Sequence, residues 1–287
     1  MAQRLVSVWQ PFLNSGENSA AALDAALELE ELGYARLWFS AGFGENVPRR
    51  FRDLLDGTKR IGVAPGIVSI WHSSPAEVAA FTADAERDHP GRFLLGLGAS
   101  HAPLVEEKGI DYRKPYSKMV SYLDALDDAG LPRSQRVLAA LGPRMLELSR
   151  DRSAGAHPYF TPVEHTAEAR AALGADRLLA PEVAVVVDPD AGSARATARQ
   201  YTAGYLALPN YTNNLRRFGW TDDDLAGGGS DRLVDALIPW GTPEQVAAGV
   251  EKHFEAGADE VAIQVLNGGN AGAFPADAFR TLAAILI

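Results

Sequence analysis

Eight short apolar segments, each followed by a segment with helical features, constrain the fold of this chain more than any other feature. One of them, Val183–Val187, is apolar throughout, as is typical of a parallel strand buried on both faces. Because helices that cross over between parallel strands cover the sheet, this alternation predicts a closed (β/α)8 TIM barrel. The alternative is a doubly wound protein of two domains. No linker rich in Pro or Ser divides the chain, so we expect a single domain over residues 1–287.

The elements expected from hydrophobic periodicity and from helix start and stop signals follow one another regularly along the chain. The expected strands are Arg4–Gln10, Ala35–Ser40, a strand within Arg60–Trp71, Phe93–Leu97, Arg136–Leu141, Ala156–Phe160, Val183–Val187 and Glu260–Leu266. The expected helices are Ser19–Leu32, Arg49–Leu55, Ser74–Arg87, Tyr116–Asp127, Arg144–Ser153, Thr166–Leu173, one from about Ser193, Pro243–Ala256 and Ala276–Leu286.

The connection between strands seven and eight, which includes the segment Ala191–Trp240, is extended compared with the others. Barrel connections are usually short, and a long one is typically a lid or a binding loop. We therefore expect Tyr211, Asn213 and Arg217 to lie near the barrel mouth and to shape the substrate pocket. The alternative is that the segment packs only on the outer helices, with a homodimer interface as one option.

Composition and charge exclude several classes of function. The chain has no cysteine, so disulfides, thiolate zinc sites and iron–sulfur clusters are ruled out. A net charge of −10 disfavours a nucleic-acid partner, which would require a basic stripe. The amino-terminal residues do not resemble a signal peptide, and no apolar run approaches membrane-spanning length, so we expect a cytoplasmic protein without a membrane partner.

The residues at the carboxyl ends of the expected strands indicate the chemistry of the site, because barrel enzymes build their sites there. No lysine is found among them, which disfavours Schiff-base chemistry, and no His-x-His pair or carboxylate cluster, so no metal site is expected. What remains is aromatic, neutral-polar and histidine-lined, and suits a flat heteroaromatic ring on a redox cofactor. These residues are Gln10, Ser40, Ser69, Trp71, Ser100, His101, Gly142, His157, Tyr159, Gln264 and Asn267.

The segment Pro90–Glu106, which reads PGRFLLGLGASHAPLVE, is the richest of these strand ends. Gly96 and Gly98 lie in an apolar strand, where glycine indicates a close approach of the backbone to another group. Ser100 and His101 follow where a buried strand would surface. The segment is therefore either part of a reaction site or a core strand followed by a loop whose histidine is only hydrogen-bonded.

Two further turns are candidates for cofactor contacts. Gly142, Pro143 and Arg144 lead from a strand into a helix, and backbone N–H groups at a helix start can bind an anion. An ordinary tight turn with a solvated arginine would have the same sequence pattern. His157 precedes a proline and is held extended, pointing either into the pocket or into a structural hydrogen bond.

With these residues assembled, the chain resembles the luciferase-like monooxygenase superfamily, and more narrowly its coenzyme F420-dependent oxidoreductase branch. The resemblance covers nearly the whole chain. It is carried by GRFLLGLGASHAPLVE from Gly91, RVLAALGPRMLELSRDRSAGAHPYFTPVEHT from Arg136, LALPNYTNNLRRFGWTDDDLAGGGSDRLVDALIPWG from Leu206 and GADEVAIQVL from Gly257.

The resemblance implies a bacterial-luciferase-like barrel that binds a deazaflavin or flavin at its mouth. It implies a non-prolyl cis peptide bond at Gly66–Ile67, next to the cofactor ring, and a cofactor phosphate at the turn Gly142–Met145. Sugar-phosphate dehydrogenases of this branch have an Asp-His pair after strand two, where this chain has Ser40, Ala41 and Gly42. The substrate is therefore not carried over from the resemblance.

We accordingly expect a coenzyme F420-dependent oxidoreductase acting on a small organic substrate. An FMN-dependent monooxygenase and a flavin-binding barrel without turnover are the alternatives. Arg49, Arg50 and Arg52 are basic residues available for an anionic cofactor tail. The residues assigned to the cofactor are Ser40, Gly66, Ile67, Val68, Ser69, Gly98, Ser100, Gly142, Pro143, Arg144, Met145 and His157, and those assigned to the substrate are Trp9, Phe43, Tyr159, Tyr211, Asn213 and Arg217.

His101 is the expected catalytic residue. Hydride transfer at a carbonyl or an alcohol leaves a proton to be moved, and a histidine can titrate near neutral pH. His101 is assigned this proton, or the positioning of the cofactor's reactive edge. His157, the second histidine at a strand end, is expected to matter more for stability than for turnover.

Overall fold

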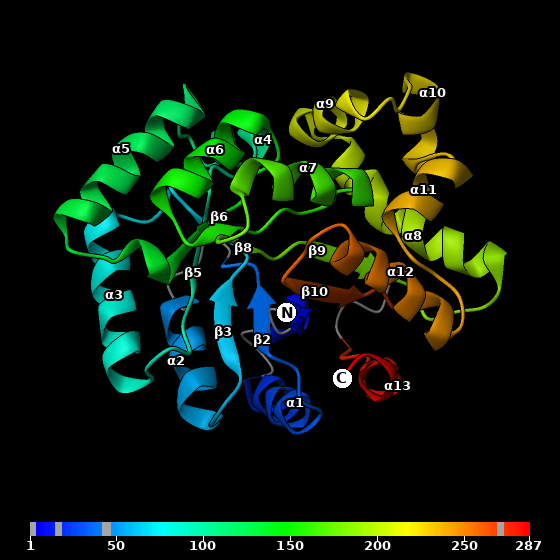
Figure 1. The fold of residues 1–287 in the computed structure, drawn as a ribbon, viewed down its shortest axis with the longest axis horizontal. Coiled ribbons are helices and arrows are strands. Elements are labelled where there is room, and N and C mark those ends of the chain that lie inside the picture. The colour runs from blue at the N-terminus through cyan, green and yellow to red at the C-terminus, as the bar shows by residue number, and fades with distance from the viewer. Residues whose placement is uncertain (1–3, 15–18, 42–46, 269–272) are drawn as a thin grey trace.

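Parallel strands form the centre of the molecule in a computed structural model that describes residues 4–14, 19–41, 47–268 and 273–287 (Figure 1). One sheet has the strand order β3-β2-β1-β10-β9, and the other has the order β4-β5-β6-β7-β8. The strands are β1 Leu5–Trp9, β2 Arg36–Phe39, β3 Gly62–Pro65, β4 Val68–Ser69, β5 Leu95–Gly98, β6 Arg136–Leu138, β7 Gly155–Ala156, β8 Leu178–Leu179, β9 Glu182–Val185 and β10 Glu260–Val265.

The two sheets are parts of one barrel. They are separate sheets because two strands of the barrel are each broken into a pair. β3 and β4 flank the Gly66–Ile67 peptide bond, and β8 and β9 flank residues 180–181. A parallel bridge between Val63 and Phe93 connects the first sheet to the second. Counting each broken pair as one strand gives eight described strands, which confirms the predicted (β/α)8 barrel.

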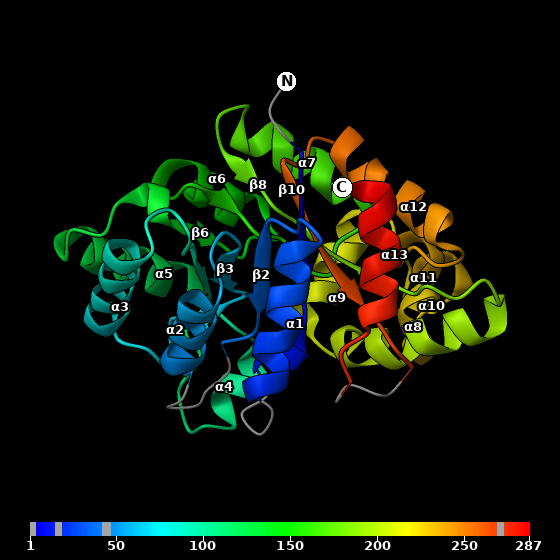
Figure 2. The same cartoon turned by 90° about the horizontal axis from the view of Figure 1, so that it is seen from below.

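Eight helices of the described chain surround the barrel, one after each of its strands (Figures 1 and 2). The first and the last, α1 and α13, lie side by side and close the ring, with Tyr34 Oη donating to the Phe279 carbonyl at 2.9 Å. The helices are α1 Ser19–Glu31, α2 Val47–Gly57, α3 Pro75–Asp88, α5 Pro115–Asp128, α6 Pro143–Arg152, α7 Val163–Leu173, α12 Pro243–Glu255 and α13 Ala276–Leu286.

Further helices stand outside this regular ring. Between β9 and α12, four segments build the extended connection that the sequence predicts, and Figure 1 shows them together at one end of the molecule. They are α8 Ala191–Leu206, α9 Pro209–Arg217, α10 Asp222–Leu225 and α11 Asp231–Leu237. The short helix α4 Ala102–Glu106 and the 3-10 turns Pro11–Asn14, Arg133–Gln135 and Ala226–Gly228 complete the described helical elements.

Local signals in the sequence account for several boundaries. Ser74 caps α3 in a capping box with Glu77, and Pro75 occupies the first turn, as expected for a helix start. The expected sixth strand was too long, because Phe160 adopts a left-handed φ of 56° and the chain leaves the sheet after Ala156. β8 was not expected, because two residues are too few to show a period.

The glycines of β5 bring two strands unusually close together. A Cβ on Gly96 would lie 2.0 Å from the Pro65 carbonyl oxygen, and one on Gly98 would lie 2.6 Å from Ile67 Cγ1. The Gly66–Ile67 bond is cis, as the resemblance implied. The predicted close approach at this strand is therefore confirmed, and its partner is the broken strand β3–β4.

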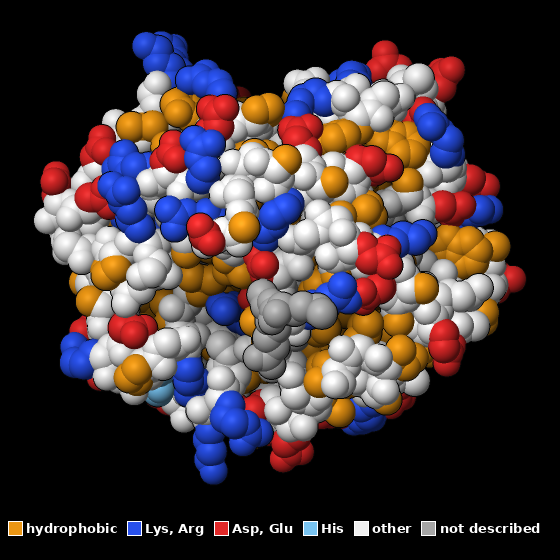
Figure 3. All heavy atoms as spheres, viewed as in Figure 1, with side chains coloured by type: hydrophobic (Ala, Val, Ile, Leu, Met, Phe, Trp, Pro, Cys, Tyr) orange, Lys and Arg blue, Asp and Glu red, His pale blue; other side chains and the backbone are white. Residues whose placement is uncertain are grey.

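The outer surface mixes charges of both signs. On the face drawn in Figure 3, acidic and basic side chains are interspersed. Within the described residues, no helix is both long and apolar enough to cross a bilayer.

Candidate functional site at the barrel mouth

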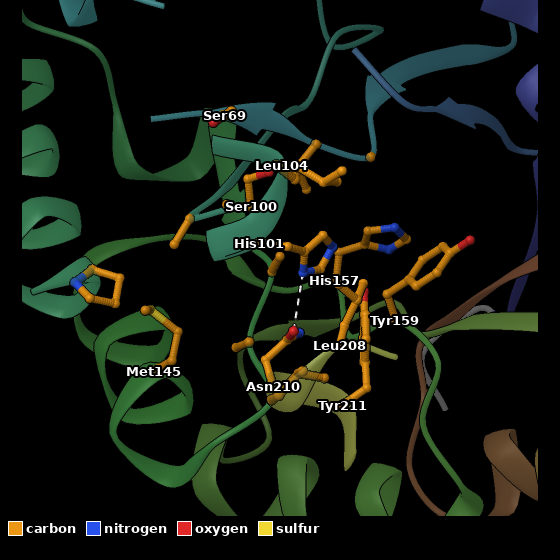
Figure 4. Close-up of a pocket in the computed structure, with 18 of the residues that line it drawn as sticks. Ser69, Ser100, His101, Leu104, Met145, His157, Tyr159, Leu208, Asn210 and Tyr211 are labelled. Atoms are coloured by element: carbon orange, nitrogen blue, oxygen red, sulfur yellow. Dashed lines mark hydrogen bonds between the residues drawn. The ribbon is translucent and has the colours of Figure 1, made fainter. Parts of the chain in front are cut away.

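A pocket of about 450 Å³ lies at the carboxyl ends of the barrel strands, which is within the usual size range of small-molecule sites. It is the place where barrel enzymes position their reactive groups. The predicted site residues that line it are Trp9, Ser40, Gly66, Ile67, Ser69, Gly98, Ser100, His101, Gly142, Met145, His157, Tyr159 and Tyr211. The structure thus brings together residues from the ends of six of the eight barrel strands and from the extended connection (Figure 4).

His157 forms the inner wall of the pocket. Its ring stacks on Trp38 with the ring centroids 4.0 Å apart, and Nδ1 lies 2.6 Å from the Ala180 carbonyl oxygen. Because a carbonyl only accepts, Nδ1 donates its proton and Nε2 is left as an acceptor. Burial lowers the pKa of His157 to about 4, so the ring is neutral at pH 7.

Two buried nitrogens at this wall have no hydrogen-bond partner among the described residues: His157 Nε2 and Trp9 Nε1. A Cβ placed on Gly66 would lie 3.3 Å from the first and 2.5 Å from the second. Both therefore converge on Gly66, one as an acceptor and the other as a donor. Buried polar atoms are normally paired, so this pair indicates a ligand that supplies a donor beside an acceptor.

His101 lies across the pocket as the N-cap of α4. Its Nδ1 is 3.2 Å from Asn210 Oδ1, as the dashed line in Figure 4 shows, and its ring centroid is 5.2 Å from that of Tyr211. Burial lowers the pKa of His101, and the hydrogen bond to Asn210 opposes this effect. The imidazole is therefore neutral near pH 7 and able to accept a proton.

The start of α6 forms another wall, with Gly142 as N-cap. Gly142 and Met145 line the pocket at the positive end of this ten-residue helix. The Arg144 guanidinium lies 4.1 Å from the centroid of the Tyr116 ring and does not line the pocket. An anion at this turn would consequently meet backbone N–H groups rather than the arginine.

A cluster of tyrosines surrounds a buried carboxyl on the remaining side. Glu182 Oε1 lies 3.2 Å from Tyr201 Oη, and Tyr201 Oη lies 3.0 Å from Tyr159 Oη. Tyr159 and Tyr205 hydroxyls are 2.8 Å apart, and both side chains line the pocket. Burial raises the pKa of Glu182 to about 8, although the hydrogen bonds from the Phe160 N–H and from Tyr201 act to lower this pKa.

The sequence model of the luciferase-like monooxygenase family matches residues 5–260. The chain belongs to this family. Its members are oxidoreductases that act on small substrates with F420 or FMN.

Three similar proteins illustrate the range of the family. A 5,10-methylenetetrahydromethanopterin reductase of Archaeoglobus fulgidus is 22% identical over 284 residues, which cover 81% of this chain and 85% of the relative. An F420-dependent secondary alcohol dehydrogenase, solved with an F420–acetone adduct, is 13% identical with a TM-score of 0.73, covering 98% of this chain and 99% of its own. The oxygenating constituent of the Pseudomonas putida 3,6-diketocamphane monooxygenase, solved with FMN, is 17% identical with a TM-score of 0.66. The match covers 99% of this chain and 97% of that protein's chain.

Some assigned residues do not line this pocket of the luciferase-like barrel. Val68, Pro143 and Arg144 are neighbours of lining residues, and Phe43 lies outside the described residues. None of the three arginines on α2 lines the pocket; Arg50 is buried, and Arg52 pairs with Asp88.

The expectation for α9 is corrected in the same way. Tyr211 lines the pocket, whereas Asn213 bonds with Arg216 and does not line it. Arg217 lies near the mouth, as expected, because it bonds with the Leu141 carbonyl at 3.4 Å as well as with Glu168, but it does not line the pocket. Residues two and six positions beyond Tyr211 are turned about 200° and 240° around a helix of 3.6 residues per turn, so they cannot share its face. Asn210, on the pocket side, contacts His101 instead.

Sequence reasoning missed Glu182, Tyr201, Tyr205 and Asn210. Glu182 is a carboxylate at the start of an otherwise apolar strand, which was an available signal because a buried strand rarely contains an unpaired charge. Tyr201 and Tyr205 are four residues apart on α8 and share one helix face. Nothing in the sequence of α9 indicated that Asn210 would reach His101.

Proposed function

We propose that this protein is a coenzyme F420-dependent oxidoreductase that transfers a hydride between the deazaflavin and a small organic substrate. The observation that carries the proposal is the pair of unpartnered atoms at Gly66, the acceptor His157 Nε2 and the donor Trp9 Nε1. The pyrimidine edge of a deazaflavin alternates C=O and N–H groups, so it can satisfy both atoms at once. FMN has the same edge, so the pair supports the ring system rather than one of the two cofactors.

The remaining lining residues fit the rest of the cofactor. Ile67 and Gly98 offer a narrow apolar surface for a flat ring, with Ile67 closely packed on β5. Gly142 and Met145, at the start of α6, suit the phosphate of the tail, because backbone N–H groups and the helix dipole favour negative charge. F420 is favoured over FMN by the similarity to the F420-dependent secondary alcohol dehydrogenase, which this chain matches with the higher TM-score of the two solved structures.

His101 is proposed to handle the proton of the reaction. A bound deazaflavin supplies or accepts the hydride, but the substrate oxygen must also gain or lose a proton. With Nδ1 donating to Asn210, Nε2 is the proton acceptor, and the lowered pKa keeps it unprotonated at pH 7. This state suits removal of a proton from an alcohol, and the protonated state suits the reverse reaction. Tyr159 and Tyr211 are proposed to contact the substrate.

Separate titrations of the protein with F420 and FMN, followed by fluorescence, test the proposal. We expect F420 to bind at least about tenfold more tightly, a difference of about 1.4 kcal/mol. Trp9→Phe keeps an aromatic ring but removes the Nε1 donor, and should weaken the binding of either cofactor. Trp220→Phe is the matched control, because Trp220 stacks with Arg232 outside the pocket. Equal or reversed affinities for F420 and FMN would contradict the cofactor assignment.

An FMN-dependent monooxygenase is the second candidate, and the FMN-bound camphane enzyme favours it. Reduced flavin activates oxygen, whereas deazaflavin does not readily form the oxygen adduct. Oxygen consumption by the reduced FMN complex would therefore establish the monooxygenase. A protein that binds a cofactor but turns over neither a carbonyl panel nor an alcohol panel would be a non-catalytic binder.

A further inference from the structure

Glu182 is a buried carboxyl without a cationic partner. Its residue is 1% exposed, and its described hydrogen bonds come from the Phe160 N–H at 3.2 Å and from Tyr201 Oη at 3.2 Å. Within the described part of the chain, no Lys or Arg forms an ion pair with it or contributes to its pKa. A buried, unpaired carboxylate is costly, so the group is held mainly in its neutral form at pH 7, with a proton to give.

A continuous series of hydroxyls connects Glu182 to the pocket. Tyr201 Oη is 3.0 Å from Tyr159 Oη, which is 2.8 Å from Tyr205 Oη. Gln264 Oε1 lies 2.9 Å from Tyr159 Oη and fixes the position of this hydroxyl, whose single proton is donated either to Gln264 or to Tyr205. Tyr201 has one proton, so when the neutral Glu182 donates from Oε1 to Tyr201, Tyr201 donates to Tyr159. In that arrangement protons can move along the series by successive exchange.

Tyr205 is the member that can reach a bound substrate. Tyr159 Oη already contacts Tyr201, Tyr205 and Gln264, and Figure 4 shows its hydroxyl pointing away from His101. Tyr205 lines the pocket, and its hydroxyl has Tyr159 as its described partner, which leaves it capacity for one more hydrogen bond.

A purely structural role explains the tyrosines but not the carboxyl. A glutamine at position 182 could accept from the Phe160 N–H and bond with Tyr201 in the same space, without the penalty of an ionisable group. What only the carboxyl adds is an exchangeable proton at the inner end of the series. The hydroxyls then provide its path to the pocket.

We propose that Glu182 is a proton reservoir for the reaction, connected to the substrate oxygen through Tyr201, Tyr159 and Tyr205. The proposal rests on the proposed oxidoreductase function. In it Tyr205, rather than His101, serves the substrate oxygen, and His101 has the other role assigned to it, the positioning of the cofactor's reactive edge. Tyr205 is the group that touches the substrate, and Glu182, Tyr201 and Tyr159 act through it. The substrate class is consequently a carbonyl compound or its alcohol, whose oxygen changes protonation during hydride transfer.

Carbonyl reduction by this route adds one hydride and one proton to the substrate. The hydride from the reduced deazaflavin bonds to the carbonyl carbon, and the π electron pair moves to the oxygen. The oxygen takes the Tyr205 proton, Tyr205 is reprotonated through Tyr159 and Tyr201, and Glu182 becomes a carboxylate. A bound deazaflavin would release its ring N–H proton on oxidation, which is the proton that would restore Glu182 to its neutral form. Alcohol oxidation runs through the same transfers in reverse.

The pH dependence follows from the groups that face Glu182. These are the hydroxyls of Tyr159, Tyr201, Tyr205 and Tyr211, from the segment after β7 and from α8 and α9, and burial raises the pKa of each. They stay neutral as the pH rises through 8, whereas Glu182 loses its proton there. Carbonyl reduction should therefore decline above pH 8.

Infrared spectroscopy and single-turnover kinetics on the full chain test the relay. The variants are Glu182→Gln, which keeps the shape of the side chain, and Tyr201→Phe, which removes the hydroxyl next to Glu182 without touching the pocket lining. Tyr34→Phe is the control, because it also removes a buried tyrosine hydroxyl bond, to Phe279, far from the site. The kinetic probe is reduced F420 with cyclohexanone, followed by the absorbance of oxidised F420.

In the apo wild type, we expect a protonated-carboxyl infrared band that disappears between pH 7 and 9, and its absence in Glu182→Gln. We expect hydride transfer at pH 7 to fall by about a hundredfold in Glu182→Gln and Tyr201→Phe, with loss of the decline above pH 8, and no change in Tyr34→Phe. Absence of that band from the wild type, or wild-type rates and pH profile in both variants, would overturn the relay.

F420 binding separates this proposal from the cofactor assignment. If wild type and Glu182→Gln bind F420 equally tightly but show identical kinetics, the relay alone fails. If the wild type does not bind F420, the proposed function fails, and the infrared band still reports whether Glu182 holds a proton.

Discussion

His157 should make the protein less stable in acid. Its pKa in the folded protein is lowered to about 4 by burial, whereas in the unfolded chain it has the ordinary value near 6.5. Between these two values the unfolded chain binds a proton that the folded protein does not, so the free energy of unfolding falls as the pH is lowered. One pKa unit corresponds to about 1.4 kcal/mol, so His157 alone removes about 3 kcal/mol between pH 6.5 and 4.

The test is His157→Asn, because the Asn side chain keeps an N–H donor near the Nδ1 position for the Ala180 carbonyl but does not titrate. At pH 7 the variant should lose about 1 kcal/mol or somewhat more, from the lost stacking on Trp38. Urea unfolding between pH 4.5 and 7.5 should show a shallower decline than in the wild type. The decline should not vanish, because burial also lowers the pKa of His253 to about 4.

The control is Thr82→Ala, which removes a buried hydroxyl bond to the Val78 carbonyl without removing a titrating group. It should lower stability equally at every pH. If His157→Asn declines in acid as steeply as the wild type and Thr82→Ala do, the neutral buried state of His157 is refuted.

Two further predictions concern the opposite wall of the pocket. His101→Ala should lower turnover by about a hundredfold or more while circular dichroism and the melting temperature stay close to the wild type, and full activity with the true substrate would contradict its assignment. Asn210→Ala removes the hydrogen bond that raises the pKa of His101, so burial should lower that pKa further. The acid limb of the pH–rate profile for alcohol oxidation should then move to lower pH, and an unmoved limb would show that another group titrates.

The fold could be predicted largely from local patterns. Apolar strand-length segments alternating with helix signals are sufficient for a parallel barrel, since each strand needs a covering helix. Ser74 before Pro75 marked the start of α3, and Gly96 and Gly98 marked a close approach. The cap is decided within a few residues of chain, whereas the partner of the glycines, the broken strand β3–β4, is brought to them only by long-range packing.

The site could be predicted only where it lies directly at a strand end. Ser69 and Gly98 end their strands, His101 and His157 come soon after theirs, and barrel topology alone brings all four to one mouth. Residues on the extended connection could not be placed in this way. The rotation of α9 about its axis, which points Tyr211 inward and Arg217 outward, is set by packing against the barrel rather than by its own sequence.

Protonation states were decided by the tertiary structure alone. His157 and His101 look alike in the sequence, but one is stacked on Trp38 and bonded to the Ala180 carbonyl, whereas the other contacts Asn210 across the pocket. Glu182 precedes the apolar run Val183–Val187 in the chain, yet in the fold it bonds with Tyr201 of α8 and lies at the end of a series of tyrosine hydroxyls. A pKa depends on burial and on every group within a few ångströms, and those neighbours are assembled only when the barrel closes.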